Sequence, residues 1–284
     1  MVTLLDGKLL SKKVQNEIAD KIEKLKVKHN KVPGLAVVLV GNDPASMAYV
    51  GRKEKMAGNI GMYSRQIQLP ETTSQVELLE IINKLNNDKE IHAILVQLPL
   101  PKHINTDKVL MTIDPEKDVD GFHPVNMGKL LSGLEPAAIP CTPLGVIKLL
   151  EDYNIELKGK NAVVIGRSNI VGKPVSILLL SRHATVTICH SRTQNIDKIC
   201  QNADIIVVAI GKEKYLKKEW VKPGAVIIDV GINRSEETGK LVGDVDFDGV
   251  KDLCSFITPV PKGVGPMTIA MLLSNTLKLF EKTL

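Results

Sequence analysis

The sequence predicts an α/β fold with two domains. Short apolar runs alternate with amphipathic helical patterns, which is the arrangement of parallel βαβ units. A stretch dense in Asp, Pro and Gly, residues 112–140, interrupts the alternation and indicates a connection between domains. A glycine-rich turn then joins a strand to a helix in residues 161–174, an arrangement that suits a phosphate group. The second domain is therefore predicted to be a Rossmann-type dinucleotide-binding domain, with the active-site cleft between the two domains.

The composition is that of a globular protein with two domains of ordinary size. The chain has 284 residues, of which 44% are hydrophobic and 24% charged. No apolar run is long enough to cross a bilayer, and the N-terminal residues lack the pattern of a secretory signal. The four cysteines form no CxxC pair and the histidines have no ligand spacing, so neither a metal site nor a disulfide framework is expected. These features predict a cytoplasmic protein.

The charge pattern argues against nucleic acid as a partner. The formal net charge is +5, the lysines are spread along the chain, and only 3% of residues are aromatic. Base-stacking platforms and a concentrated basic stripe are therefore missing from the sequence. A mild positive balance is instead suited to a small anionic ligand, with no membrane partner expected.

The first domain is predicted from residue 1 to 120, with the C-terminal helix 267–284 returning to it. Residues 35–41, LAVVLVG, are a continuous apolar run typical of a strand buried on both faces. Further strands are expected at 65–69 and 91–101, and helices at 10–25, 44–58 and from Thr73 or Ser74 onward. The last of these helices is expected to place four residues on one face: Val76, Leu79, Ile82 and Leu85.

The second domain is predicted to span residues 121–266, including the connecting segment with a short helix at 126–131. A helix restarts at Thr142 or Pro143. Strands are expected within residues 162–165, 184–190, 203–211, 224–232 and 255–260, with a short helix at 197–201.

The glycine-rich turn departs from two standard phosphate-binding fingerprints. Arg167 stands where a Walker A loop has its first glycine, and Ser168 stands where GxGxxG has its second. On the motif alone, an ordinary strand-to-helix turn and a phosphate site remain equally open. In a dinucleotide fold, an acidic residue after the second strand selects NAD, and a basic residue accepts the 2′-phosphate of NADP. The sequence there reads CHSRT, with no carboxylate, which favours NADP.

Tyr49 and Lys53 stand four residues apart on a predicted helix and therefore share one face. The simpler interpretation is a core tyrosine beside a surface lysine. The functional alternative is an aromatic platform beside an amine in a cleft, where burial would lower the lysine pKa toward neutrality and make it a usable acid or base.

Three further polar residues are candidates. Gln97 ends a buried strand, at the edge of a parallel sheet where ligands bind, although a structural glutamine with satisfied hydrogen bonds is equally compatible. Asp118 and Asp120 lie in the connecting segment and serve either turn formation or a cleft between the domains. The Pro/Gly-rich loop 258–268 is either a domain-crossing linker or a wall of that cleft.

Taken together, eight motifs resemble one family across essentially the whole chain. They are YVGRK (49–53), VQLPLP (96–101), DVDGF (118–122), PCTP (140–143), GRSNIVGKP (166–174), CHSRT (189–193), DVGI (229–232) and PVPKGVGPMT (259–268). Their order is similar to that of the bifunctional methylenetetrahydrofolate dehydrogenase/methenyltetrahydrofolate cyclohydrolase family, the FolD type. The resemblance implies NADP-dependent oxidation of 5,10-methylenetetrahydrofolate to the methenyl form, then hydrolysis to 10-formyltetrahydrofolate.

The resemblance also implies roles for individual residues. Lys53 corresponds to the family's catalytic lysine and Gln97 to the glutamine that tunes it, and Asp120 to the aspartate that holds the pterin. The implied folate-binding set comprises Tyr49, Lys53, Gln97, Leu98, Asp120, Pro259, Gly263, Val264 and Gly265. The implied NADP-binding set comprises Gly166, Arg167, Ser168, Ser191, Arg192 and Ile232. A homodimer is expected by analogy with the family.

The chain departs from the family pattern at Lys262, where a second glycine is common. A lysine there is expected to need a backbone conformation that glycine adopts more easily. Gly51, inside a predicted helix, has no functional explanation. Three rival functions remain open to test: a monofunctional dehydrogenase of the same family, a non-catalytic nucleotide-binding regulator, and a shikimate-type dehydrogenase sharing only the second domain.

Overall fold

The computed structural model describes residues 2–284, which group into two compact units. We name the units after the ligands that the sequence predicts: the dinucleotide unit contains the chain up to Lys12 together with Pro140–Met271, and the folate unit contains Lys13–Ile139 and Leu272–Leu284. Helices α1 (Gly7–His29) and α10 (Val264–Glu281) contribute residues to both units. The domain boundaries predicted from the sequence remain predictions.

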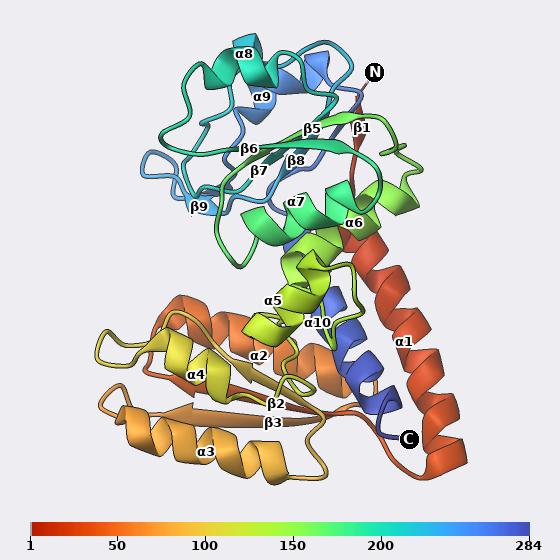
Figure 1. Cartoon of the computed structure of the whole chain (residues 1–284), viewed down its shortest axis with the longest axis vertical. Helices are drawn as coiled ribbons and strands as arrows, with labels where there is room; N and C mark the ends of the chain where they lie inside the picture. The colour runs from red at the N-terminus through yellow and green to blue at the C-terminus, as the bar shows by residue number, and fades with distance from the viewer. Residues whose placement is uncertain (1) are drawn as a thin grey trace. The chain divides into compact units, whose positions relative to one another are not determined.

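The folate unit is built on a three-stranded parallel sheet of order β3-β2-β4. Its strands are β2 (Gly34–Val40), β3 (Tyr63–Leu69) and β4 (Ala93–Val96). All residues of β2 are buried, as its continuous apolar run predicts. Four further helices belong to this unit: α2 (Pro44–Asn59), α3 (Gln75–Asn87), α4 (Thr106–Thr112) and α5 (Pro124–Leu131). Figure 1 shows α2 and α3 on opposite faces of the sheet.

Helix α3 corrects one prediction about its apolar face. Val76 is 66% exposed, whereas Leu78, Ile82 and Leu85 are buried against the sheet. Residues spaced by four and three lie on one face of a helix, while two residues such as 76 and 78 point in nearly opposite directions. The N-terminus is as predicted, because the Ser74 hydroxyl accepts the N–H of Glu77 at 3.2 Å.

The dinucleotide unit contains a six-stranded parallel sheet of order β1-β11-β8-β7-β5-β6, which confirms the predicted fold class. Its strands are β1 (Thr3–Leu4), β5 (Asn161–Ile165), β6 (Thr185–Cys189), β7 (Ile205–Val208), β8 (Val226–Asp229) and β11 (Phe256–Ile257). The chain reverses its winding direction between β5 and β7, and ligands bind at the carboxyl ends of strands at such a switch point.

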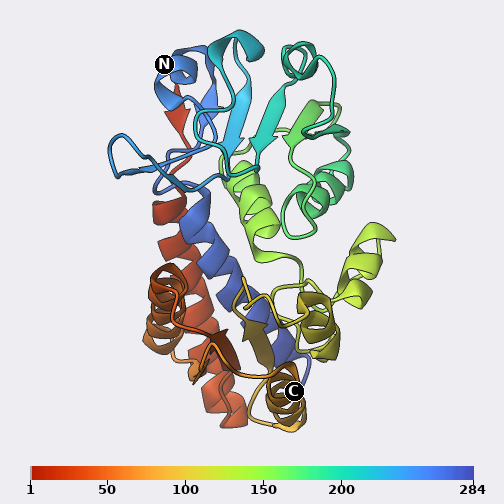
Figure 2. The same cartoon turned by 90° about the vertical axis from the view of Figure 1, so that its left-hand side faces the viewer.

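Helices cover both faces of this sheet (Figure 1). Helices α6 (Cys141–Asp152) and α7 (Gly172–Leu180) lie on one side, and α8 (Ile196–Cys200) and α9 (Phe247–Val250) on the other. Two short 3₁₀ turns at Lys218–Trp220 and Lys251–Leu253 and a small hairpin of β9 (Asn233–Arg234) and β10 (Leu241–Val242) complete the unit. Strand β1 was not predicted. Figure 2 shows it in red beside β11, which it pairs with through Thr3–Phe256 and Leu4–Ile257.

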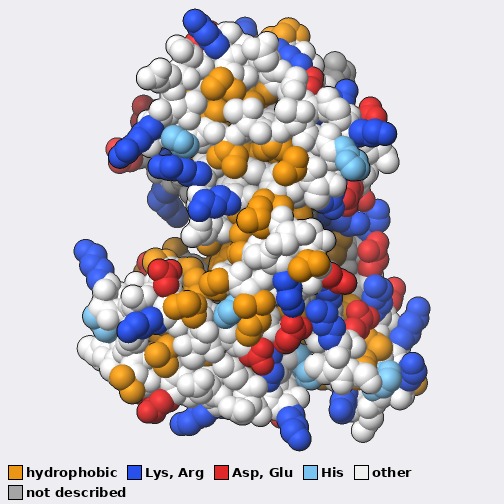
Figure 3. Space-filling view, in the orientation of Figure 1, with side chains coloured by type: hydrophobic (Ala, Val, Ile, Leu, Met, Phe, Trp, Pro, Cys, Tyr) orange, Lys and Arg blue, Asp and Glu red, His pale blue; other side chains and the backbone are white. Residues whose placement is uncertain are grey.

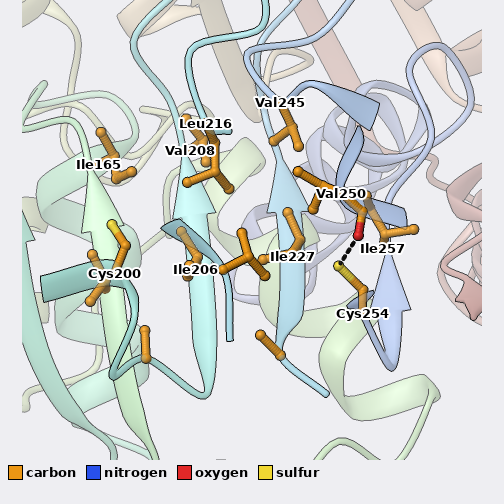
Figure 4. Close-up of a cluster of buried hydrophobic side chains, with 14 of the residues drawn as sticks. Ile165, Cys200, Ile206, Val208, Leu216, Ile227, Val245, Val250, Cys254 and Ile257 are labelled. Atoms are coloured by element: carbon orange, nitrogen blue, oxygen red, sulfur yellow. Dashed lines mark hydrogen bonds between the residues drawn. The ribbon is translucent and has the colours of Figure 1, made fainter. Parts of the chain in front are cut away.

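The core of the dinucleotide unit is formed by side chains of neighbouring strands, including Ile165, Ile206, Ile227 and Ile257 (Figure 4). Cys254 belongs to this core, and its thiol donates to the carbonyl of Val250 at 3.3 Å. Burial raises the pKa of Cys254 to about 12. The four cysteines are all buried with free thiols, and this one packs as a small apolar side chain.

Residues 2–284 show neither a membrane-spanning helix nor a cluster of metal-ligand side chains. No helix in that range is both long and apolar enough to cross a membrane. The same residues contain no group of three or more His, Cys, Asp or Glu side chains that could hold a metal ion. On the face drawn in Figure 3, Lys and Arg side chains are scattered and interspersed with Asp and Glu.

Candidate active site

Helix α2 carries Lys53 into the interior of the folate unit. The Asp43 carboxylate caps the helix by accepting the N–H of Ser46 at 2.8 Å, and Pro44 occupies the first turn. This start places Ser46, Val50, Lys53 and Ala57 on the buried face. Lys53 is only 6% exposed, so the simpler interpretation of a surface lysine is wrong.

Lys53, Gln97 and Tyr49 are brought together. The Lys53 Nζ donates to Gln97 Oε1 at 3.0 Å and lies 4.4 Å from the centroid of the Tyr49 ring. Gln97 directly follows β4, and its own N–H donates to the carbonyl of Val38 at 2.8 Å. The Gln97 amide nitrogen donates to the carbonyl of Leu98 at 2.7 Å, which turns the amide oxygen toward the lysine. The side chain therefore has one fixed orientation.

The two aspartates of the connecting segment differ in environment. Asp118 is 2% exposed, and its carboxylate accepts from the N–H of His123 at 2.8 Å and the Asn126 side chain at 2.9 Å. Burial raises the pKa of Asp118, and these two donors oppose the rise. Asp118 therefore has the turn-forming role that the sequence left open.

Asp120 is half-buried and follows a segment held along β4. Asp118 bridges to Ile94 in parallel, and the carbonyl of Val119 accepts from the Asn275 side chain at 2.9 Å. Two parallel segments run in the same direction from their bridge. Asp120, two residues after Asp118, therefore lies at the same edge of the sheet as Gln97, which follows the last residue of β4.

A pocket of about 300 Å³ opens at the carboxyl ends of β5, β6 and β7. Its ten lining residues are Ile165, Gly166, Arg167, Ser168, His190, Ser191, Ala209, Ile210, Lys212 and Tyr215. Four of the six residues predicted to bind the cofactor are in this set, and Arg192 and Ile232 are not. The residues after β7 were missed, although their place at the end of a buried apolar strand was visible in the sequence.

The lining suits a phosphate-bearing dinucleotide. Arg167 and Lys212 supply cations, Ser168 and Ser191 supply hydroxyls, and none of the ten residues is acidic. His190 accepts the N–H of Arg192 on its Nδ1 at 3.2 Å, which leaves its Nε2–H as a donor.

The glycines of the phosphate turn are required by close packing of the backbone. Gly166 has φ +131°, and a Cβ there would lie 2.4 Å from the carbonyl oxygen of Ala209. A Cβ on Gly172 would lie 2.2 Å from the carbonyl oxygen of Gly166. Only glycine fits at either position without moving the neighbouring chain.

One expectation about this turn needs correction. The predicted phosphate site at this turn relies on free amide groups at the start of α7. Instead the Ser168 hydroxyl oxygen accepts the N–H groups of Val171 at 3.1 Å and Gly172 at 3.3 Å. The extra residues between the two glycines let Ser168 fold back onto the helix start, where its oxygen satisfies these donors. Its own hydroxyl proton can still be donated.

In the loop before α10, Lys262 has the glycine-like backbone conformation that was expected where the chain departs from the family pattern. Lys262 has φ +88°, a region that residues with a side chain rarely adopt. Its carbonyl accepts the N–H of Lys8 at 3.0 Å, and a Cβ on Gly7 would lie 1.8 Å from the carbonyl oxygen of Gly263. The start of α1 thus packs directly against this loop.

The remaining residues predicted around folate lie in or next to the same loop. Val264 is buried, and a Cβ on Gly265 would lie 3.5 Å from Cδ1 of Ile232. Ile232 is 60% exposed, so this side chain is close to the loop and accessible. Pro259, at the start of the loop, follows Thr258, whose hydroxyl is bonded to the N–H of Asp229 at 2.7 Å.

Two family models match the chain, one over residues 5–120 and one over residues 140–284. The model for "Tetrahydrofolate dehydrogenase/cyclohydrolase, catalytic domain" matches residues 5–120. The model for "Tetrahydrofolate dehydrogenase/cyclohydrolase, NAD(P)-binding domain" matches residues 140–284. The first match is incompatible with an enzyme that shares only the second domain, such as a shikimate-type dehydrogenase.

Relatives and solved structures are similar over the full length. A "Bifunctional protein FolD" from Streptococcus pneumoniae serotype 4 is 56% identical, over 100% of this chain and 99% of its own. The crystal structure of the bifunctional FolD enzyme from Campylobacter jejuni is 52% identical, with a TM-score of 0.98 and 100% of each chain covered. The Trypanosoma brucei FolD enzyme, "complexed with NADP cofactor and inhibitor", is 40% identical, with a TM-score of 0.95 over 99% of this chain and 98% of its own.

These matches confirm the predicted family and its dehydrogenase and cyclohydrolase character, and the second family model is of an NAD(P)-binding domain. The roles of individual residues remain predictions. The chain belongs to the tetrahydrofolate dehydrogenase/cyclohydrolase family.

Proposed function

We propose that this chain oxidises 5,10-methylenetetrahydrofolate with NADP and then hydrolyses the methenyl product to 10-formyltetrahydrofolate. The observation that carries the proposal is the buried Lys53 amine, held against Gln97 at 3.0 Å and beside the Tyr49 ring. NADP, when bound, supplies the acceptor for the hydride that leaves the methylene carbon.

Lys53 moves the protons of the hydrolytic step. Water adds to the cationic methenyl carbon and gives up one proton to Lys53 in its neutral form. The bond between that carbon and N5 then breaks as Lys53 returns the proton to N5, and the remaining hydroxyl proton passes to solvent as the C=O bond forms, which leaves the formyl group on N10. The Gln97 oxygen holds Nζ in place, because the Gln97 amide nitrogen is itself fixed on the Leu98 carbonyl.

The chemistry of the side chains assigned to folate suits this substrate. The Tyr49 ring stacks on the aminobenzoyl ring of the substrate. The Asp120 carboxylate accepts two adjacent N–H groups of the pterin edge, which a carboxylate can do with both oxygens. Leu98 and the loop formed by Pro259, Gly263, Val264 and Gly265 complete the binding set.

The cofactor is held by the turn after β5 and the segment after β6. Gly166 allows close approach, and Arg167, Ser168 and Ser191 offer a guanidinium and two hydroxyls to phosphate oxygens. Arg192 adds a second guanidinium and Ile232 an apolar contact. The lack of a carboxylate in the pocket lining supports NADP over NAD.

Replacement of Lys53 by methionine tests the hydrolytic role. Lys53→Met is expected to abolish hydrolysis of methenyltetrahydrofolate while NADP still binds, because methionine fills similar volume without a titratable group. The matched control is Lys55→Met, since Lys55 is exposed on the same helix. Retained hydrolysis in Lys53→Met would refute the role.

Replacement of Asp120 tests the folate site. Asp120→Ala is expected to weaken folate binding because two N–H groups of the pterin lose their charged acceptor. An unchanged folate affinity, measured by fluorescence titration, would remove Asp120 from the site.

A monofunctional dehydrogenase of the same family is the main alternative, and a non-catalytic regulator is the second. Absorbance with methylenetetrahydrofolate and either NADP or NAD separates them. The proposal expects a methenyl signal with NADP that then decays enzymatically. A signal without enzymatic decay would favour the monofunctional enzyme, and no signal with either cofactor would favour the regulator.

We also propose that the protein is a homodimer of a reducing cytosol. Strand β6 is an edge strand of the dinucleotide sheet, with the sequence TVTIC, no charge, no proline and an Ile188 that is 41% exposed. Such an edge can pair with its copy around a twofold axis. Ile188→Lys is expected to give a monomer by light scattering, while the control Leu241→Lys, at a position 43% exposed elsewhere, leaves the dimer intact.

A further inference from the structure

A buried carboxylate lies behind the wall of the cofactor pocket. Asp244 is fully buried, and its Oδ2 accepts the N–H groups of Ile210 at 2.7 Å and Gly211 at 3.0 Å. Its Oδ1 accepts the N–H of Lys212 at 2.9 Å and the side-chain amide of Asn233, also at 2.9 Å. Three consecutive backbone N–H groups thus converge on one side chain.

This convergence is an anion-binding concavity filled by the protein's own carboxylate. Successive N–H groups converge in this way when one residue of the turn has positive φ, and Gly211 has φ +66°. Ile210 and Lys212 belong to the lining of the pocket. The shape of that wall is therefore set from behind by Asp244.

The carboxylate of Asp229 fixes the backbone position of Asp244. Asp229, at the end of β8, accepts the N–H of Asp244 at 2.9 Å and of Gly231 at 3.0 Å on Oδ1, and the N–H of Val245 at 2.9 Å on Oδ2. Burial raises the pKa of Asp229 to about 7; these backbone donors oppose the rise and the charge of Asp244 adds to it. Asp229, at the end of β8, thus fixes the backbone of Asp244. The side chain of Asp244 in turn fixes the segment that follows β7.

The glycines around the pair leave no room for another arrangement. A Cβ on Gly231 would lie 2.1 Å from Oδ1 of Asp244, and a Cβ on Gly243 would lie 1.8 Å from Oδ2 of Asp229. Both contacts are far below van der Waals distance, so the two carboxylates are enclosed by backbone on these sides.

We propose that Asp244 is a positioning residue for the cofactor: by holding the N–H groups of residues 210–212, it keeps the pocket wall formed before NADP arrives. Without this anion, the three N–H groups would lose their shared acceptor, and the loop would have to be ordered at the expense of binding energy. The inference deepens the proposed function, on whose NADP dependence it rests.

The bifunctional chain offers an internal control for this role. Hydrolysis of methenyltetrahydrofolate depends on Lys53 and Gln97 in the folate unit and needs no NADP. A loosened pocket wall therefore affects the dehydrogenase step through NADP binding and leaves hydrolysis unchanged, whereas general unfolding lowers both activities together.

The variant Asp244→Asn tests the proposal in the full-length protein. Its KM for NADP is expected to rise by about tenfold or more, with kcat at saturating NADP and the hydrolysis rate nearly unchanged. The matched control is Asp204→Asn at the opposite end of β7, where the carboxylate accepts the N–H of Asn161 at 2.7 Å. Asp204→Asn is expected to leave the KM for NADP unchanged.

A measurement on the unmodified protein covers the case in which Asp244→Asn does not fold. Hydrogen exchange at the amides of residues 210–212 is expected to be slow in the free enzyme without NADP. An unchanged KM in a folded Asp244→Asn, parallel loss of both activities in a folded variant, or fast exchange at these amides until NADP is added would each overturn the proposal. Absence of NADP-dependent oxidation in the unmodified enzyme would instead refute the proposed function, and slow exchange would still support the positioned loop.

Discussion

The loop before α10 offers a test of backbone strain at Lys262. Its φ of +88° places a lysine where glycine is the ordinary residue, so the change Lys262→Gly removes the unfavourable contact between Cβ and backbone. The side chain is exposed, so little packing is lost with it. The hydrogen bond from the N–H of Lys8 to the carbonyl of residue 262 is retained in the variant, because it involves only the backbone.

The expected gain follows from two opposing contributions. A left-handed backbone costs a residue with a side chain roughly 1–2 kcal/mol. Glycine removes that cost but loses roughly 0.5–1 kcal/mol more conformational entropy on folding. Lys262→Gly should therefore raise the free energy of unfolding by roughly 0–1.5 kcal/mol, with a central value of about 0.75 kcal/mol.

Urea denaturation of three proteins, the unmodified chain, Lys262→Gly and Lys262→Ala, measures the effect. Alanine removes the charge and retains the strained backbone, so it should bring no gain in stability. If Lys262→Gly is no more stable than Lys262→Ala, the backbone at residue 262 does not carry the strain inferred from its φ angle. A cation that assists folate binding would appear separately, as an equal rise in the folate KM of both variants.

Three further predictions concern the folate unit. An added Cβ at Gly51 or Gly58 in α2 meets nothing within 4 Å, so Gly51→Ala and Gly58→Ala should each stabilise the protein by about 0.5–1 kcal/mol in urea denaturation. If the substrate approaches the helix at Gly51, only Gly51→Ala should also raise the folate KM. His92 accepts the N–H of Gly34 on Nδ1 at 2.9 Å, and burial, with help from Lys117, lowers the pKa of His92 below its ordinary 6.5. Its stabilising contribution is therefore complete above pH 6.5 and is lost as the pH falls through the lowered pKa, a trend that His92→Asn should flatten in denaturation at pH 7.5 and 5.5. Asp118→Asn should destabilise by about 1–3 kcal/mol, because an amide has one acceptor oxygen and cannot serve all the donors of His123, Asn126 and Phe122, while the exposed control Glu80→Gln should change little.

Much of the fold follows from local patterns in the sequence. The run LAVVLVG forms β2 because seven consecutive apolar residues can be buried only where both faces are covered. Asp43 and Pro44 begin α2 through interactions within four residues. Strand β1 could not be predicted in this way, because two residues carry no periodicity and their partner is Phe256, at the other end of the chain.

The sequence predicted which residues belong to the site better than it predicted which contacts they make. Lys53 and Tyr49 share a helix face by spacing alone, but spacing does not say that this face is turned toward the sheet. The roles of Asp244 and Ile210 depend on a hydrogen bond between residues 34 positions apart, which no local pattern records. Ser168 was assigned to the cofactor, and its bonds to the start of α7 come from the conformation of the inserted loop.

The pairing of β1 with β11 has a consequence for synthesis of the protein. A ribosome adds about 5–20 residues per second, so Thr3 waits roughly 10–50 s before its partner Phe256 emerges. During that interval the first strand has no sheet to join, and a fragment beginning at Pro140 would leave β11 as an uncovered edge. The N-terminal residues can therefore complete the dinucleotide sheet only when translation is nearly finished.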